Sequence, residues 1–96
     1  MTATTLQITC IHKRPHQDPH QRLVSVGGVK PDGSRWKLTE VQAITAIKAG
    51  TMHFYLTGGG RTIRVLVEHH HAREFLKTED DGDVPEVLLS LPECPP

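Results

Sequence analysis

One helical segment stands between two groups of strand-like segments, and this order constrains the fold more than any other feature. Thr39 with Gln42 three residues later is a capping box at the start of the helix, and Gly50 is a typical stop. On both sides of the helix, apolar residues alternate with polar ones, as they do in half-buried strands. The pattern predicts an α+β fold: a small antiparallel sheet of about five strands with one α-helix packed on one face.

The expected elements are separated by segments rich in proline, glycine and charge. The pattern predicts strands over 6–11, 22–29, 35–38, 53–57, 61–68 and 73–78. The apolar face expected for the helix consists of Val41, Ala43, Ile44, Ala46 and Ile47. Between these elements we expect a polar loop over 13–21, a hairpin turn at Gly58–Gly60 and a solvated acidic loop over 79–83.

The C-terminal segment, residues 84–96, is too apolar for a solvated tail. It carries Val87, Leu88, Leu89 and Leu91, which are costly to leave in water. We therefore expect it to pack on the body of the domain. Residues 1–5 are expected to form a flexible N-terminus, and the 96 residues are expected to form a single domain over 1–96.

Charge and composition exclude several classes of protein. Eleven Lys and Arg balance eleven Asp and Glu, so nucleic-acid binding is the least favoured function. No apolar run is long enough to cross a membrane, and the N-terminus lacks the pattern of a signal peptide. We expect a soluble cytoplasmic protein. A disulfide between Cys10 and Cys94 is conceivable, but in the cytoplasm we expect two free thiols, with Cys10 buried.

An ordered set of short motifs runs along nearly the whole chain. The set comprises Pro19-His20-Gln21-Arg22, Val26-Gly27-Gly28, Gly33-Ser34-Arg35-Trp36, Ala43-Ile44, Phe54-Tyr55, Phe75-Leu76-Lys77-Thr78 and Leu88-Leu89-Ser90-Leu91-Pro92. In this order the motifs resemble a bacterial and phage family known as domain of unknown function 3892. The chain departs from the family pattern at His69–His71, where a turn with glycine is expected. The resemblance implies a fold and supplies no catalytic residues.

The most interesting candidate binding residues are Arg22, Lys77, Trp36 and the Gly27-Gly28 pair. The glycine pair suggests a bulge, or a point where another backbone or a ligand approaches closely. If the strands that carry Arg22 and Lys77 are neighbours, the two cations could frame a pocket with Trp36 as its wall. Such a pocket suits an anion with a planar group, such as a nucleotide. The alternative, which we favour for Trp36, is that its ring anchors the core.

Histidines offer two further candidates. His69 and His71 can share one side of a strand and bind a metal ion if a third ligand comes from His53, His20 or His16. We favour a solvated turn and expect no metal.

The second candidate is the set His16, Asp18 and His20, which could act as an acid/base group. Nothing in the sequence positions these side chains, so the polarity of a loop explains them better.

The sequence favours a small binding domain over an enzyme, with no cofactor, as a monomer or homodimer. Its ligand is expected to be either a protein partner or a small anionic molecule. The alternative is a small hydrolase or nuclease that depends on a metal or on histidine, and a nucleic-acid-binding module ranks third.

Overall fold

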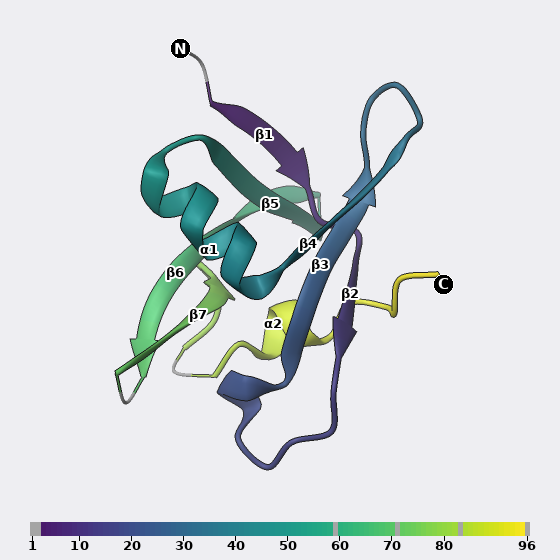
Figure 1. Ribbon diagram of the computed structural model, residues 1–96. Helices are drawn as coiled ribbons and strands as arrows, with labels where there is room; N and C mark the ends of the chain where they lie inside the picture. Colours follow the sequence, from purple (N-terminus) through teal and green to yellow (C-terminus); the bar gives the residue numbers. More distant parts are fainter. Residues whose placement is uncertain (1–2, 59, 71, 83, 96) are drawn as a thin grey trace.

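Two small sheets share one core in this protein. The computed structural model describes residues 3–58, 60–70, 72–82 and 84–95. One sheet contains, in spatial order, β1 (Thr4–Gln7), β5 (Met52–Gly58), β6 (Arg61–His70) and β7 (Arg73–Thr78) (Figure 1). The other contains β2 (Cys10–Lys13), β3 (Leu23–Val29) and β4 (Arg35–Thr39). The α+β class is confirmed, but the strands are divided between two sheets.

The first predicted strand, residues 6–11, is in fact two strands that belong to different sheets. β1 runs parallel to β5, so the first sheet is not purely antiparallel. The amide of Ile8 donates to Tyr55 and that of Thr9 donates to Gly27, so the chain changes sheets between these two residues. Thr4 and Thr5 lie in β1, and the expected flexible N-terminus over residues 1–5 is wrong at these two positions.

The predicted helix is confirmed as α1 (Glu40–Ala49). The Thr39 side chain accepts from the amide of Gln42, the Gln42 side chain accepts from the amide of Thr39, and Gly50 ends the helix with φ of 73°. Its buried face differs from the expected one, because Val41 is 70% exposed. The predicted residues Ala43 and Ile44 are buried, and Glu40 rather than Val41 lies beside them, since positions i, i+3 and i+4 share one side of a helix.

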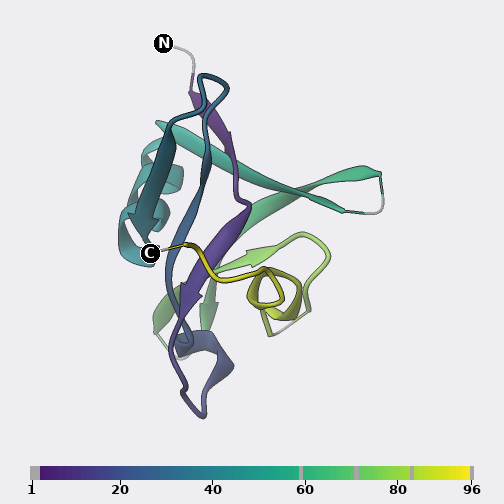
Figure 2. The same ribbon diagram turned by 90° about the vertical axis from the view of Figure 1, so that its right-hand side faces the viewer.

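The C-terminal segment contributes to the core through the short helix α2 (Glu86–Leu89). Leu88 and Leu89 are buried, and Val87 and Leu91 pack against the same cluster. Asp81 joins this helix to β7, because its carboxylate accepts from the amides of Thr78 and Val87 at 2.9 and 2.7 Å. Figure 2 shows α1 and α2 on opposite sides of the molecule.

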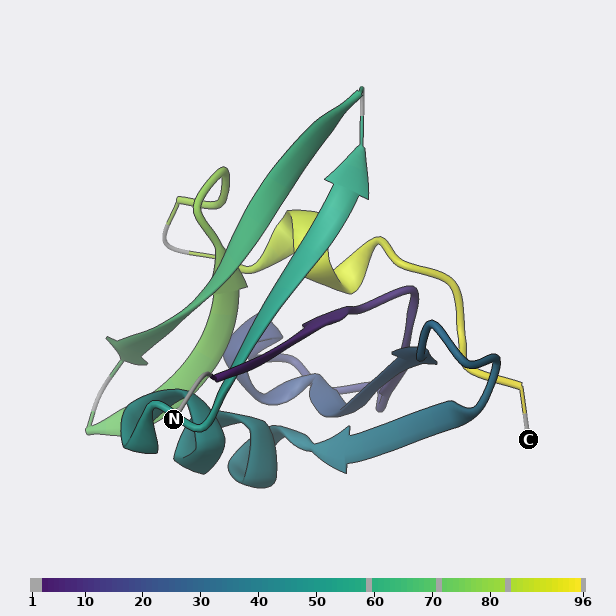
Figure 3. The ribbon, with the colours of Figure 1, turned by 90° about the horizontal axis from the view of Figure 1, so that it is seen from above.

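The strands β5 and β6 extend away from the body as a hairpin (Figures 2 and 3). Next to its turn, Arg61 forms two hydrogen bonds with the carboxylate of Asp80, at 2.9 and 3.0 Å. Of the three glycines in the predicted turn, Gly59 lies outside the described residues. Among the described residues, no helix is long and apolar enough to cross a membrane.

Candidate functional site

The structure brings Gly27, Gly28 and Trp36 together. Gly28 lies opposite Trp36 in the β3–β4 pair, and a Cβ at Gly28 would lie 2.3 Å from the carbonyl oxygen of Gln7 and 2.9 Å from Trp36 Nε1. A Cβ at Gly27 would lie 2.9 Å from the carbonyl oxygen of Trp36 and 3.1 Å from the sulfur of Cys94. The glycine pair therefore permits a close approach of protein groups on both faces of β3.

The Trp36 ring stacks on Phe54 with 5.5 Å between centroids, and it packs against the core. Its Nε1 is buried and has no hydrogen-bond partner among the described residues. These contacts favour the core role of Trp36 over the role of a ligand-stacking wall.

Arg22 and Lys77 do not frame one pocket, because the strands that would bring them together belong to different sheets. Arg22 directly precedes β3 in one sheet, whereas Lys77 lies in β7 and pairs with Leu66 of β6 in the other. The ammonium group of Lys77 donates to the carbonyl oxygen of Gly82 at 3.2 Å and lies 3.6 Å from the carboxylate of Glu68. The premise that the two strands are neighbours is wrong.

Arg22 instead lines a basic cavity between the β2–β3 loop and α2. We call this cavity, which has a volume of about 390 Å³, the basic cleft. Its lining residues are Lys13, Arg14, Pro15, Arg22, Leu89 and Glu93. The cleft thus places three cations beside one carboxylate and two apolar side chains.

Local backbone geometry explains why the two arginines meet. The amide of Arg14 donates to the carbonyl oxygen of Arg22 at 2.8 Å, so the loop returns to its starting point. The Nε of Arg14 donates to the carbonyl oxygen of Gln21 at 2.8 Å, and the Nε of Arg22 donates to that of His16 at 2.7 Å. Both guanidinium groups are therefore held in place by the loop itself.

The three cations of the cleft lack close acidic partners among the described residues. In the described part of the chain, Lys13, Arg14 and Arg22 form no ion pair within 4.0 Å. Although the net charge of the chain is zero, six Lys and Arg but only two acidic residues lie between positions 13 and 37. Between positions 68 and 93 the balance reverses, to two Lys and Arg against eight acidic residues. The basic cleft draws its cations from the positively charged part of the sequence.

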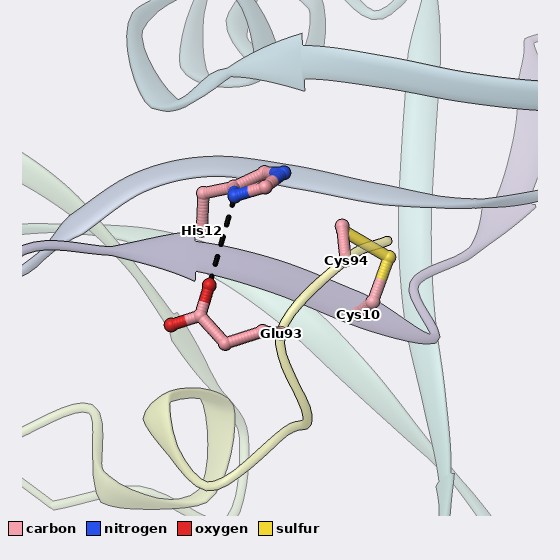
Figure 4. The surroundings of a disulfide bond; sticks show 4 residues. All are labelled: Cys10, His12, Glu93 and Cys94. Carbon is pink, nitrogen blue, oxygen red and sulfur yellow. Dashed lines mark ion pairs between the residues drawn. A yellow bond between two sulfur atoms is a disulfide. The ribbon is translucent and has the colours of Figure 1, made fainter. Parts of the chain in front are cut away.

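A disulfide joins Cys10 to Cys94, so the prediction of two free thiols is wrong (Figure 4). The C-terminal segment lies beside β2, because the amide of Ile11 donates to Pro92 and the amide of Cys94 donates to Ile11. This pairing brings the two Cα atoms to 4.8 Å, and Cys10 is half-buried rather than buried. The expectation of free thiols followed from the expected cytoplasmic location, and disulfides are rare in cytoplasmic proteins.

A second basic cavity, of about 330 Å³, lies beside the disulfide. Besides both cysteines and Pro95, it is lined by His12, Gly28, Arg35, Trp36 and Lys37. His12 Nδ1 lies 3.6 Å from the carboxylate of Glu93, and Figure 4 shows this pair next to the disulfide. Arg35 and Lys37 are exposed, and no hydrogen bond from the protein fixes either side chain among the described residues. This cavity is therefore less organised than the basic cleft.

His70, which is not one of the predicted pair His69 and His71, meets another part of the chain. His69 is exposed, with Nε2 3.5 Å from Glu74, and His71 lies outside the described residues. The neighbouring His70 points to the other side of β6, where its ring stacks on His20 with a centroid distance of 3.8 Å.

Asp18 completes this cluster, because its carboxylate lies 2.8 Å from His20 Nδ1. Hydrogen bonds from the side chain and the amide of His20 hold the pKa of Asp18 well below its ordinary value of 3.8. An ionised carboxylate only accepts hydrogen bonds, so Nδ1 of His20 carries the proton in this contact. Asp18, His20 and His70 are the described residues best placed to hold a metal ion.

The model of a family described as a protein of unknown function, DUF3892, matches residues 7–92. The chain belongs to this family. It has no significant match among curated proteins or among solved structures. The family description assigns no activity, so the function has to be argued from the geometry of the clefts.

Sequence reasoning named Arg22 but missed its two partners, Lys13 and Arg14. A signal was present, since basic residues flank both ends of the proline-containing loop over 13–22. A loop whose ends both lie in paired strands returns near its starting point, which brings its two ends together. The contribution of Leu89 and Glu93 could not be anticipated, because it depends on where the C-terminal segment lies.

Proposed function

We propose that this protein is a binding domain for a small anionic molecule, and that the basic cleft holds the anionic group. The observation that carries the proposal is the convergence of Lys13, Arg14 and Arg22 on one cavity without an ion pair to any described acidic residue. Like charges held together repel one another, and a bound anion removes that repulsion.

The geometry favours a phosphate or carboxylate group as the part that is recognised. A guanidinium group presents its N–H donors in a planar fork that matches two oxygens of such an anion. The Nε atoms of Arg14 and Arg22 are occupied by backbone carbonyls, so both groups are oriented before the ligand arrives. Preorganisation of this kind reduces the entropy lost on binding.

The rest of the cleft suits a small organic molecule. A volume of about 390 Å³ lies within the range of known ligand sites, roughly 300–1,000 Å³. Pro15 and Leu89 offer apolar surface for the uncharged part of the ligand. The described lining residues include no histidine and no hydroxyl or thiol side chain that could act as a nucleophile, so we propose binding rather than hydrolysis.

A thermal-shift screen tests this proposal. Inorganic pyrophosphate, nucleotides and phosphorylated sugars are compared with chloride at equal ionic strength. A ligand at one hundred times its dissociation constant stabilises the native protein by about 2.7 kcal/mol. We expect stabilisation of the wild-type protein and its loss in the double variant Arg14→Gln, Arg22→Gln.

The matched control is the double variant Arg35→Gln, Lys37→Gln, which removes the same number of charges from the neighbouring cavity. This control should retain the stabilisation. If both double variants lose it equally, the anion binds through general surface charge and the proposal fails. Lys13→Gln leaves both arginine contacts to the loop intact, so it serves as a second test if the first double variant is unstable.

A further inference from the structure

We propose that Asp18, His20 and His70 form a binding site for a divalent transition-metal ion, which can be probed with Zn²⁺. One potential ligand atom from each residue lies within 4.8 Å of the other two. His20 and Asp18 belong to the β2–β3 loop, where His20 lies in the 3-10 helix η1 (Pro19–Gln21), whereas His70 ends β6. Two parts of the chain fifty residues apart thus bring nitrogen and oxygen donors to one place.

The donor set fits the chemistry of such ions. Two imidazoles and a carboxylate are ligands that Zn²⁺ accepts, at about 2.0–2.2 Å from the metal, and three protein ligands leave one position open. Ligand atoms of a tetrahedral ion are about 3.3 Å apart at these bond lengths. The Asp18–His20 separation of 2.8 Å is already close to that value.

Burial and packing hold His20 in position. It is 6% exposed, and its ring meets Phe75 edge-on with 4.6 Å between centroids. The carboxylate of Asp18 also accepts from the amide of His20 and from the Gln21 side chain, at 3.0 and 3.2 Å. These contacts make Asp18 and His20 parts of a capped turn, and the His70 ring joins them from β6 by stacking on His20.

The rings of His20 and His70 lie almost parallel, at 11° to each other. Because a nitrogen lone pair lies in the plane of its ring, two parallel rings cannot direct both lone pairs at one ion. Metal binding therefore requires the half-exposed His70 ring to turn out of the stack, while the buried His20 stays in place. The ion takes the place of the proton between His20 and Asp18, and that proton passes to solvent.

The space that this movement needs is present beside His70. A cavity of about 430 Å³ is lined by Glu68, His69, His70, Phe75 and Lys77. The fourth coordination position would face this cavity, where a water molecule or a small ligand could occupy it. The basic cleft is a different cavity with different lining residues, so this inference does not depend on the proposed function.

The site is tested by titration with ZnCl₂. The full-length protein carries no tag, and it is first treated with EDTA and desalted. We expect saturable binding of one ion per chain. Binding should be at least tenfold weaker in His70→Gln and in Asp18→Asn, two changes that leave the buried His20 ring in place.

His53→Gln is the matched control, because it removes an exposed histidine of β5 that does not line this cavity. Its affinity for Zn²⁺ should equal that of the wild-type protein. Substitution of Co²⁺ should give the visible absorption of a tetrahedral ion, and this absorption should be lost in His70→Gln. The proposal is overturned if the wild-type protein binds less than one ion per chain, or if His53→Gln weakens binding as much as His70→Gln does.

Discussion

The amide of Arg14 donates a hydrogen bond to the carbonyl oxygen of Arg22 at 2.8 Å. This single contact closes the β2–β3 loop and places two guanidinium groups on the wall of one cavity. The same loop carries Asp18 and His20, which lie near His70 at the end of β6. One short connection therefore supplies residues to both sites that we propose.

The disulfide should govern the stability of the protein. Its two cysteines are 84 residues apart, and a bridge of that span stabilises a small domain by roughly 2–5 kcal/mol. We expect no free thiol in denatured, unreduced protein and two after reduction. Cys94→Ser should lower the free energy of unfolding in urea by that amount, and the reduced wild-type protein should lose about as much. Two thiols per chain before reduction would contradict this account.

Gly28→Ala should destabilise the protein strongly. The new Cβ would lie 2.3 Å from the backbone oxygen of Gln7, which cannot move without disturbing the chain between β1 and β2. We expect a loss of about 3 kcal/mol in the free energy of unfolding, at the upper end of the usual cost of overpacking.

Gly58→Ala is the control for this change. Among the described residues, a Cβ at Gly58 would meet only a side-chain atom of Ile63, at 3.7 Å, so the effect should stay within about 0.5 kcal/mol. Equal effects of the two substitutions in urea unfolding would show that the contact at Gly28 is not responsible.

The buried carboxyl of Glu40 should make stability depend on pH. Burial raises its pKa above the ordinary value of 4.5, although the amide of Leu76 and the guanidinium of Arg73 oppose the shift. The unfolded state therefore loses this proton first as pH rises. Well below pH 4.5, Glu40 is protonated in both states and does not lower the free energy of unfolding. As pH rises above 4.5, the free energy of unfolding decreases, and the decrease stops once the folded carboxyl has also ionised.

Glu40→Gln removes this titration and keeps an oxygen that can accept from Leu76, whose amide lies 3.3 Å away. The free energy of unfolding of the variant, relative to the wild-type protein, should therefore increase as pH rises above 4.5. Urea unfolding at several pH values measures this difference. A difference that is constant with pH would mean that Glu40 titrates alike in both states.

The C-terminal helix should be essential to the core. Leu88 is fully buried, so Leu88→Ala should cost about 2–5 kcal/mol. Val41→Ala, at an exposed position of α1, should change the free energy of unfolding by no more than about 0.5 kcal/mol. Thermal unfolding gives the melting temperatures of the two variants, and that of Leu88→Ala should be clearly lower. Similar melting temperatures would argue that α2 does not belong to the core.

Local signals predicted the elements that depend on neighbouring residues. The capping box at Thr39 and the stop at Gly50 fixed the helix, because both act within one turn of it. The alternation over 61–68 and 73–78 predicted β6 and β7 to within a few residues. The division of the first predicted strand was not visible, since Ile8 is buried and apolar whether the strand is continuous or changes sheets.

The features that the sequence did not predict depend on contacts between residues far apart in the chain. The pairing of Cys10 with Cys94 depends on the C-terminal segment lying beside β2, and no local pattern specifies that position. The meeting of His20 with His70 depends in the same way on how the two sheets pack. Arg22 was found from its sequence context, but its expected partner Lys77 lies in the other sheet.

The central claim is that Arg14 and Arg22 bind an anion in the basic cleft. The most direct test is an NMR titration of wild-type, ¹⁵N-labelled protein with inorganic pyrophosphate, followed at the arginine Nε–H signals. It needs no substitution, so a loss of folding cannot explain the result. The signals of Arg14 and Arg22 should shift in a saturable manner, while those of Arg61, Arg64 and Arg73 stay in place. Saturable shifts at Arg35 with Arg14 and Arg22 unaffected, or no shift at any arginine, would contradict the account.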